Sequence, residues 1–152
     1  NMNYYNIEKY NRLKMMEAQT ILCVSHTHRL AKEKNVTFDM LSDEKLIMYN
    51  TDSAQNDMIL SRFHSMQIQP NILMYCSQLY TTLNFVRKGD GSAFLYSSLA
   101  VNPRDFVQIP LEPRLSTDFA MIWKKDAFTP LRTSKFIDFA SGYDITPYLP
   151  TL

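Results

Sequence analysis

The chain has 152 residues, of which 45% are hydrophobic and 20% charged, a balance typical of one soluble globular domain rather than a disordered segment. Lysine and arginine total 16 against 15 aspartate and glutamate, so the net charge of +1 gives no electrostatic footprint for nucleic acid. No apolar run approaches the roughly 20 residues that a membrane helix needs. We therefore expect a globular domain that contacts neither DNA nor a membrane through this segment.

Two cysteines, Cys23 and Cys76, each lie inside an apolar run, and no CxxC pattern is present. We expect both to be free thiols in a reducing compartment, because disulfides persist mainly in oxidising ones. No signal peptide is visible. The expected location is the cytoplasm.

The first half of the chain predicts two strands and a helix. Gln19–Val24 is continuously apolar, which is typical of a strand buried on both faces, and Lys45–Tyr49 predicts a second strand. Between them, Val36–Leu41 predicts a short helical turn capped by Thr37. The polar residues after the second strand offer several N-caps for a helix from Ala54 to Met66.

A strand–helix–turn–strand unit occupies the middle of the chain. The strand Ile72–Tyr75 leads to a helix that Ser77 can cap, and Gly89 can end that helix in left-handed backbone because it has no Cβ. The strand Ala93–Tyr96 follows at once. Two strands joined through a packed helix are parallel, so we expect these two strands to be adjacent and parallel.

The last third predicts two extended pieces and a helix. Phe106–Leu111 lies between prolines and predicts an edge strand, and Phe119–Trp123 predicts a further strand. A last helix begins at Thr133 or Ser134 and ends at Gly142. Together the elements predict an α/β domain with a parallel or mixed sheet.

No pattern in the sequence indicates catalysis or a metal site. His26 and His28 would share one face of a strand, but no third ligand is evident, so ordinary hydrogen bonds are their expected role. Serine, histidine and aspartate occur without a nucleophile elbow. The Gly89-Asp90-Gly91 turn follows a helix and precedes a strand, the reverse of the order in a phosphate-binding loop. We therefore expect no enzyme, no metal and no cofactor.

Polar residues at the ends of the predicted strands are the candidate ligand site. In a parallel α/β sheet, ligands bind beyond the carboxyl ends of the strands, beside helix N-termini that favour negative charge. The candidate ligand-binding residues are Tyr49, Asn50, Thr51, Ser77, Gln78 and Tyr96. Short hydroxyl and amide groups in that setting suit a small polar ligand, with a carboxylate as the candidate. For Thr51 and Ser77, the alternative is that each only caps its own helix.

Four stretches, taken in order, resemble the effector-binding domain of LysR-type transcriptional regulators. They are similar to that family's strand and HPLA-like segment (TILCVSHTHRLA), to the stretch that follows it (VTFDMLSDEKL), to a helix end with a glycine turn and strand (FVRKGDGSAFLYSSLA), and to a late strand with the last helix (FAMIWKKDAFTPLRTSKFIDF). Arg29 and Tyr96 stand where the family commonly has proline. The resemblance covers Lys14–Tyr143.

The resemblance implies a two-lobe, periplasmic-binding-protein-like (type II) α/β fold with mixed, mainly parallel sheets. Residues 1–35 and 116–152 would belong to lobe one, and residues 36–115 to lobe two. Nothing before Gln19 resembles the opening elements of lobe one or a helix-turn-helix, so we expect lobe one to be incomplete and DNA contacts to belong to an absent N-terminal domain. Six apolar residues are expected to be buried on both sheet faces by further residues or another chain: Ile21, Leu22, Val24, Phe119, Met121 and Ile122.

The implied function is ligand sensing in a bacterial transcription regulator. A small-molecule effector bound between the lobes would change their closure, and so the spacing of DNA-binding heads in a homo-oligomer. The alternative is a transport-type solute-binding protein of the same fold, against which the free cysteines and the HPLA-like segment count. The identity of the ligand does not follow from the fold.

Overall fold

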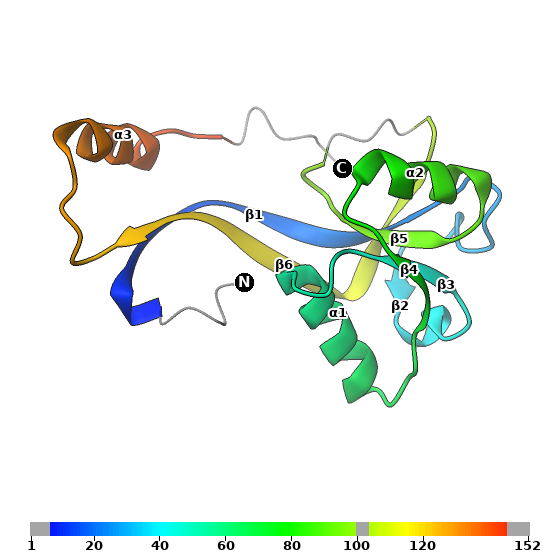
Figure 1. Ribbon diagram of the computed structural model, residues 1–152. Helices are drawn as coiled ribbons and strands as arrows, with labels where there is room; N and C mark the ends of the chain where they lie inside the picture. Colours follow the sequence, from blue (N-terminus) through cyan, green and yellow to red (C-terminus); the bar gives the residue numbers. More distant parts are fainter. Residues whose placement is uncertain (1–6, 100–103, 146–152) are drawn as a thin grey trace.

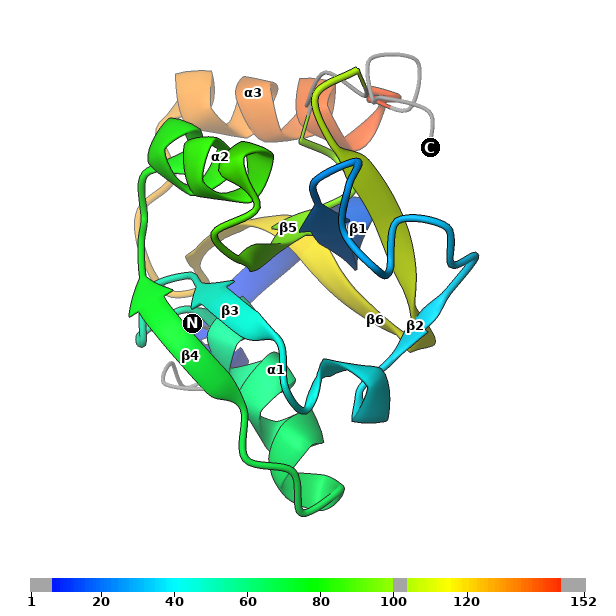
Figure 2. The same cartoon turned by 90° about the vertical axis from the view of Figure 1, so that its right-hand side faces the viewer.

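The computed structural model describes residues 7–99 and 104–145, which form a six-stranded sheet with α1 and α2 on its two faces (Figures 1 and 2). The strands are β1 (Tyr10–Val24), β2 (Val36–Thr37), β3 (Lys45–Met48), β4 (Asn71–Tyr75), β5 (Ser92–Tyr96) and β6 (Val107–Lys124). The α-helices are α1 (Ala54–Ser65), α2 (Leu79–Lys88) and α3 (Leu131–Ser141), and single 3-10 turns occur at Ile7–Lys9 and Asp39–Leu41. None of the described helices is long and apolar enough to cross a lipid bilayer.

The sheet is mixed, with the strand order β2-β6-β1-β5-β3-β4. β3 is parallel to its neighbours β4 and β5, β2 is parallel to β6, and β1 is antiparallel to both β5 and β6. The strands Ile72–Tyr75 and Ala93–Tyr96 are therefore parallel within one sheet, but the prediction that they are adjacent is wrong, because β3 lies between them. A helical crossover sets the relative direction of two strands, yet it can pass over a strand that already occupies the neighbouring place.

β1 and β6 are both longer than the sequence predicts. Gln19–Val24 is only the last part of β1, and the predicted pieces Phe106–Leu111 and Phe119–Trp123 fall in the single strand β6. β6 is bordered by β1 along its length and by β2 only at Leu111 and Glu112. The edge position predicted for Phe106–Leu111 therefore agrees with Val107–Pro110, which pair on one side only, and does not hold at Leu111.

The first half of β1 and the second half of β6 form a two-stranded ribbon that extends away from the remaining strands. Its pairing runs from Tyr10 opposite Lys124 to Thr20 opposite Leu115, with a bulge between Lys14 and Met16. α3 follows the ribbon and lies at its far end from α1 and α2 (Figure 1). The ribbon is therefore the connection between α3 and the rest of the described chain.

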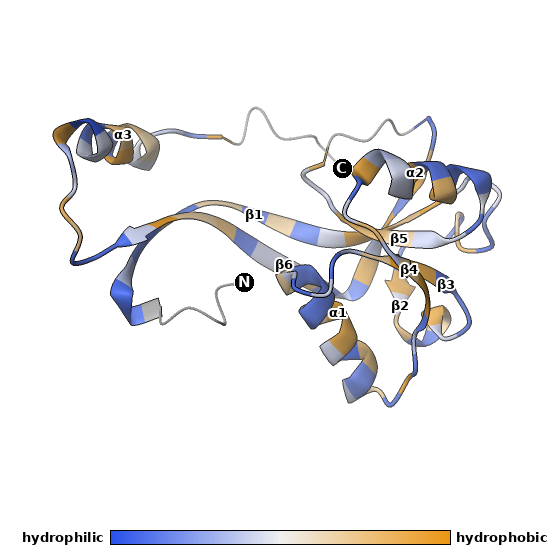
Figure 3. Cartoon of the chain, viewed as in Figure 1, coloured by the Kyte–Doolittle hydropathy of each residue, from blue (hydrophilic) through white to orange (hydrophobic). Residues whose placement is uncertain are grey.

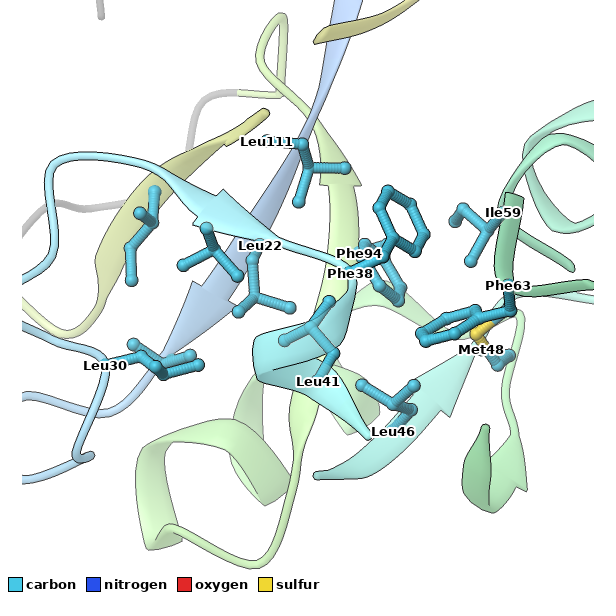
Figure 4. Close-up of a cluster of buried hydrophobic side chains, with 13 residues drawn as sticks. Leu22, Leu30, Phe38, Leu41, Leu46, Met48, Ile59, Phe63, Phe94 and Leu111 are labelled. Atoms are coloured by element: carbon cyan, nitrogen blue, oxygen red, sulfur yellow. The ribbon is translucent and has the colours of Figure 1, made fainter. Parts of the chain in front are cut away.

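Two apolar clusters fill the two faces of the sheet. On the α1 face, Leu22 and Val24 pack with Phe94, Ile59 and Phe63 in the larger cluster (Figure 4). On the α2 face, the alternate residues of the same strands pack with that helix: Ile21, Cys23, Ile47, Leu95, Leu83 and Val86. Successive β1 side chains enter opposite clusters, so the prediction that this apolar run is buried on both faces is confirmed.

The ribbon and α3 expose apolar side chains instead of burying them. Phe119 and Ile122 are each 40% exposed, so the described residues alone do not bury them. Phe128 is 90% exposed, and Phe136 and Phe139 of α3 are also exposed. Figure 3 shows hydrophobic residues among polar ones along α3, which lies apart from the sheet. That further residues or another chain cover this region stays a prediction.

Three predicted helix boundaries have different outcomes. Gly89 ends α2 with φ 80°, as predicted, because only glycine adopts left-handed backbone without a Cβ clash. The helical turn predicted from Val36 is wrong at its start: Val36–Thr37 is strand β2, and the 3-10 turn begins after Phe38 with no side-chain cap. α3 begins at Leu131, earlier than predicted, and Gly142 is its C-cap, with right-handed backbone.

The loop after β1 holds His26 and His28, which do not lie on a strand. Leu30 N donates to His28 Nδ1 (3.3 Å), so His28 Nε2 carries the hydrogen that it donates to Glu44 Oε2 (2.8 Å). Arg29 Nε donates to the other oxygen of the buried Glu44 carboxylate (2.6 Å). Within residues 7–99 and 104–145, no three His, Cys, Asp or Glu side chains are grouped to hold a metal ion. The two hydrogen bonds to Glu44 hold this loop against the segment before β3.

Candidate ligand-binding site

A cavity of about 370 Å³ lies at the carboxyl ends of β3, β4 and β5, within the size range of small-molecule sites. The chain leaves β3 through α1 toward β4, whereas it leaves β5 toward β6 on the opposite side. α1 and α2 lie on opposite faces of the sheet (Figure 2). Connections that diverge in this way leave a crevice at a topological switch point, where ligands bind in open α/β sheets.

One wall of the cavity comes from the end of β3 and the first turn of α1. Ser53 is the N-cap of α1, because its Oγ accepts a hydrogen bond from Asn56 N (3.1 Å), so Thr51 does not cap this helix. Gln55 lies one turn before Ile59 on the face of α1 that packs on the sheet, and it is only 4% exposed. Its Nε2 atom has no hydrogen-bond partner among the described residues.

A second wall comes from the loop after β4 and the first turn of α2. Cys76 N donates to Met48 O (2.9 Å), which extends the pairing of β3 with β4. The prediction that Ser77 caps α2 is wrong: Gln78 is the N-cap residue, with extended backbone and no side-chain hydrogen bond to the helix. The first N–H groups of α2 therefore lack a side-chain acceptor. Thr82, one turn into α2, is buried and also lines the cavity.

The third wall joins the end of β5 to the ribbon. The Tyr96 ring packs edge to face on Phe119 of β6, and both line the cavity. Burial raises the pKa of the Tyr96 phenol, and a hydrogen bond with Thr117 acts in the opposite direction on that pKa. The chain after Tyr96 is fastened to β1, since Ser97 N donates to Gln19 O (2.8 Å) and Gln19 N donates to Ser97 Oγ (3.2 Å).

The structure brings three of the six sequence-predicted site residues to this cavity. Tyr49, Ser77 and Tyr96 line it, whereas Asn50, Thr51 and Gln78 are not among its described lining residues. Whether any of the six binds a ligand stays a prediction. The lining is mostly apolar, and no charged side chain is among the described residues that form it.

Sequence reasoning missed three polar lining residues, which are Ser53, Gln55 and Thr82. Helical spacing was the available signal for two of them. Gln55 lies four residues before Ile59 and eight before Phe63, so it shares their buried face of α1. Thr82 lies beside Leu83 on the buried face of α2. The pattern that identifies Gln55 and Thr82 is therefore a polar residue near the start of a helix, at a position where the helical spacing predicts a buried apolar one.

Comparisons with known proteins give a consistent result. Residues 4–143 match the family described as the LysR substrate binding domain. The chain is similar to YwbI of Bacillus subtilis (strain 168), described as an uncharacterized HTH-type transcriptional regulator, with 26% identity over 129 residues. That match covers 82% of this chain and 43% of YwbI, so the chain spans less than half of the relative's length.

Two solved structures illustrate the similarity in fold. The effector binding domain of QuiR in complex with shikimate superposes with a TM-score of 0.79 at 22% identity, covering 93% of this chain and 68% of that one. The CcmR regulatory domain of Synechocystis PCC6803, in complex with 2-PG, superposes with a TM-score of 0.80 at 14% identity, covering 90% and 67%. At these identities the likeness shows a shared fold.

Proposed function

Because the chain belongs to the LysR substrate binding domain family, we propose that it senses a small-molecule effector for a bacterial transcription regulator, and that the cavity at the ends of β3, β4 and β5 is the effector site. The position of the cavity carries this proposal. It lies at the switch point of the sheet, and its walls include the first turns of two helices.

The chemistry of the cavity supports a small effector with a carboxylate. Free N–H groups at the start of a helix favour negative charge, and those of α2 have no side-chain cap. Two domains of similar fold are described in complex with shikimate and with 2-PG. Tyr49, Ser77 and Tyr96 are the sequence-predicted residues in reach of such a ligand. Asn50, Thr51 and Gln78 would act in the loops that flank it.

The effector site would lie between two lobes. Residues 36–115 would form lobe two, and residues 1–35 with 116–152 would belong to an incomplete lobe one. Cavity residues come from both parts, since Phe119 lies in β6 of the proposed lobe one while Cys76 and Tyr96 lie in lobe two. The exposed apolar side chains of α3 support the idea that lobe one needs a further partner.

Effector binding would act on the whole regulator by changing lobe closure. DNA would be contacted by a part of the protein outside this chain, as the description of YwbI as an HTH-type regulator suggests. We place the regulator in the cytoplasm as a homo-oligomer. A transport-type solute-binding protein is the less favoured alternative, because the relative YwbI is described as a transcriptional regulator.

The test is a titration of the full-length protein with a panel of small organic acids that includes shikimate, followed by calorimetry. Ser77→Trp places a bulky ring at the exposed rim of the cavity, and Ser61→Trp places the same ring on an exposed part of α1 outside it. Binding that is lost in Ser77→Trp and retained in Ser61→Trp supports the proposal. Binding that survives Ser77→Trp unchanged places the effector elsewhere and contradicts it.

A further inference from the structure

We propose that the side-chain hydroxyl of Thr82 recognises the effector, and that it holds the single carboxylate of a small, mainly apolar molecule at the start of α2. This inference rests on the proposed function, because it names the recognition chemistry of the same cavity. It adds a specificity-determining residue that lies inside a helix, beyond the loops at the strand ends.

The first argument is that the Thr82 hydroxyl forms no hydrogen bond within the described residues. A helical serine or threonine commonly returns its hydroxyl to a carbonyl oxygen three or four residues earlier, as Ser65 does to Arg62 O (2.8 Å). Thr82 is bonded to Gln78 only through its backbone, from Thr82 N to Gln78 O (3.0 Å). Thr82 is 6% exposed, and a buried hydroxyl without a partner is unfavourable. A bound molecule would supply the missing partner.

The second argument is that a molecule in the cavity can reach this hydroxyl. Thr82 Oγ1 is not among the unpartnered polar atoms that are sealed from solvent, which include Gln55 Nε2. Because it has no partner, it therefore retains accessible surface. Helical side chains lean toward the N-terminus of their helix, so Thr82 covers the first turn of α2. Ser77 and Leu79, at that turn, line the cavity together with Thr82. The hydroxyl thus lies on the cavity side of α2.

The third argument is the charge that this place favours. Gln78 gives the first N–H groups of α2 no side-chain acceptor, and free N–H groups at a helix start carry partial positive charge. The Thr82 hydroxyl is a further donor beside them. A carboxylate has two oxygens, so one carboxylate can accept from the hydroxyl and from the helix start together.

The fourth argument limits the ligand to one charge. No charged side chain is among the described residues that line the cavity, and most of the lining is apolar, with contributions from Met48, Leu79, Phe94 and Leu95. One carboxylate can be stabilised by helix N–H groups, whereas burying further charges without a cation is unfavourable. Phosphorylated compounds and dicarboxylates are therefore poor candidates, and a monocarboxylate with an apolar body fits.

Three probes with the same ring test the ligand class on the full-length protein, with dissociation constants measured by ligand-observed NMR. Benzoate carries one carboxylate, benzamide carries a neutral amide, and phthalate carries two carboxylates. We expect benzoate to bind most tightly, because benzamide lacks the charge that the helix start favours and the second charge of phthalate has no partner. Tighter binding of benzamide or phthalate, or no binding of benzoate, would overturn the inference.

Two substitutions test Thr82 itself. Thr82→Val removes the hydroxyl but keeps the shape of the side chain, and Thr82→Ser keeps the hydroxyl. We expect Thr82→Val to weaken benzoate binding about tenfold, and Thr82→Ser to bind close to the wild type. Without ligand, Thr82→Val should melt at the wild-type temperature or above it, because an unpartnered buried hydroxyl has been removed.

The matched control is Thr81→Val, at the neighbouring threonine, which is exposed and is not among the described lining residues. It should change neither benzoate binding nor the benefit of removing the hydroxyl in α2. If Thr82→Val melts clearly below the wild type while Thr81→Val does not, the Thr82 hydroxyl has a partner within the protein. Its role is then structural, and the inference is overturned.

The outcomes separate this inference from the proposed function. If Ser77→Trp abolishes benzoate binding but Thr82→Val binds as the wild type does, the cavity remains the effector site and the role of Thr82 is wrong. If Thr82→Ser binds as weakly as Thr82→Val, packing rather than the hydroxyl causes the loss, and the assignment is also wrong. If neither Ser77→Trp nor Thr82→Val changes benzoate binding, the ligand lies elsewhere and the proposed function fails as well.

Discussion

The Tyr96 and Phe119 rings meet edge to face, with centroids 5.1 Å apart and planes inclined by 84°. Tyr96 ends β5 and Phe119 lies in the outer half of β6, so this one contact joins the central strands to the ribbon. It also closes one side of the cavity. Edge-to-face pairs of this kind contribute roughly 0.5–1.5 kcal/mol beyond the area that they bury.

Phe119→Ala should lower the free energy of unfolding by about 1–2 kcal/mol, because it removes the ring contact and part of the buried area. It should also lower the pKa of the Tyr96 phenol toward its ordinary value of 10.0, because burial is the main cause of its raised pKa. Denaturant unfolding and NMR titration of labelled tyrosine measure the two effects, with Tyr96→Phe to assign the signal. Phe128→Ala, at a ring that is 90% exposed, should change neither quantity. An unaltered Tyr96 pKa in Phe119→Ala would contradict the account.

Ser53→Ala should destabilise the protein by about 1 kcal/mol, because the Asn56 N–H loses its acceptor at the start of α1. Thr51→Ala and Ser77→Ala should stay within roughly 0.5 kcal/mol of the wild type, since neither residue caps a helix. Thermal unfolding followed by circular dichroism compares the three. Equal losses at Ser53 and Thr51 would show that the cap has been assigned to the wrong residue.

The ribbon should lose stability in acid through Asp118. Lys14 Nζ and Arg12 Nη2 each lie 2.6 Å from its carboxylate oxygens, and the hydrogen bond from Lys14 is the first cause of its lowered pKa. Because the folded-state pKa is depressed, the contribution is present above the ordinary value of 3.8 and is lost as the pH falls through the folded value. Asp118→Asn should therefore melt below the wild type at neutral pH, and the gap should close in acid and shrink in salt.

The matched control for that pH series is Asp126→Asn, at an exposed aspartate just after the ribbon. Its melting curve should follow the wild type at every pH. A gap between wild type and Asp118→Asn that stays constant down to the lowest pH would rule out the carboxylate charge as its cause.

The two cysteines should react very differently with iodoacetamide at about pH 8. Burial raises the pKa of the Cys23 thiol to about 12, so almost no thiolate, the reactive form, is present in the folded state. Cys76 is half-buried in the cavity wall and should be alkylated without unfolding. Peptide mass mapping should find label on Cys76 alone in native protein and on both after denaturation, with Cys76→Ser as the control. Native labelling of Cys23 would show that β1 opens readily.

The sequence predicted most element positions, because their signals are local. The apolar run at Gln19–Val24 and the glycine at the end of α2 each identify their element without reference to the rest of the chain. The first half of β1 carries no such signal. Arg12, Lys14 and Glu17 alternate with less polar residues there, so the strand character of this half depends on its pairing with β6, about a hundred residues later.

The candidate site was only half predictable for a similar reason. That polar residues gather beyond the ends of β3, β4 and β5 follows from the fold class, and Tyr49, Ser77 and Tyr96 were found by that rule. The rule searches loops, whereas Gln55 and Thr82 lie inside helices on their buried faces. The prediction that Ser77 caps α2 was wrong because the helix begins one residue later than the sequence suggests. The extended backbone at Gln78 sets that start, and the sequence does not show it.

The central place of β1 has a consequence for synthesis on the ribosome. β1 pairs with β5 on one side and β6 on the other, and both are made long after it. This strand from the middle of the sheet is thus made before both of its partners, and it stays without either of them until residues 92–124 have been released. Because β1 closes long loops when it finally pairs, folding should be slow. Because an apolar strand left unpaired for that time is prone to aggregate, folding should also depend on chaperones during translation.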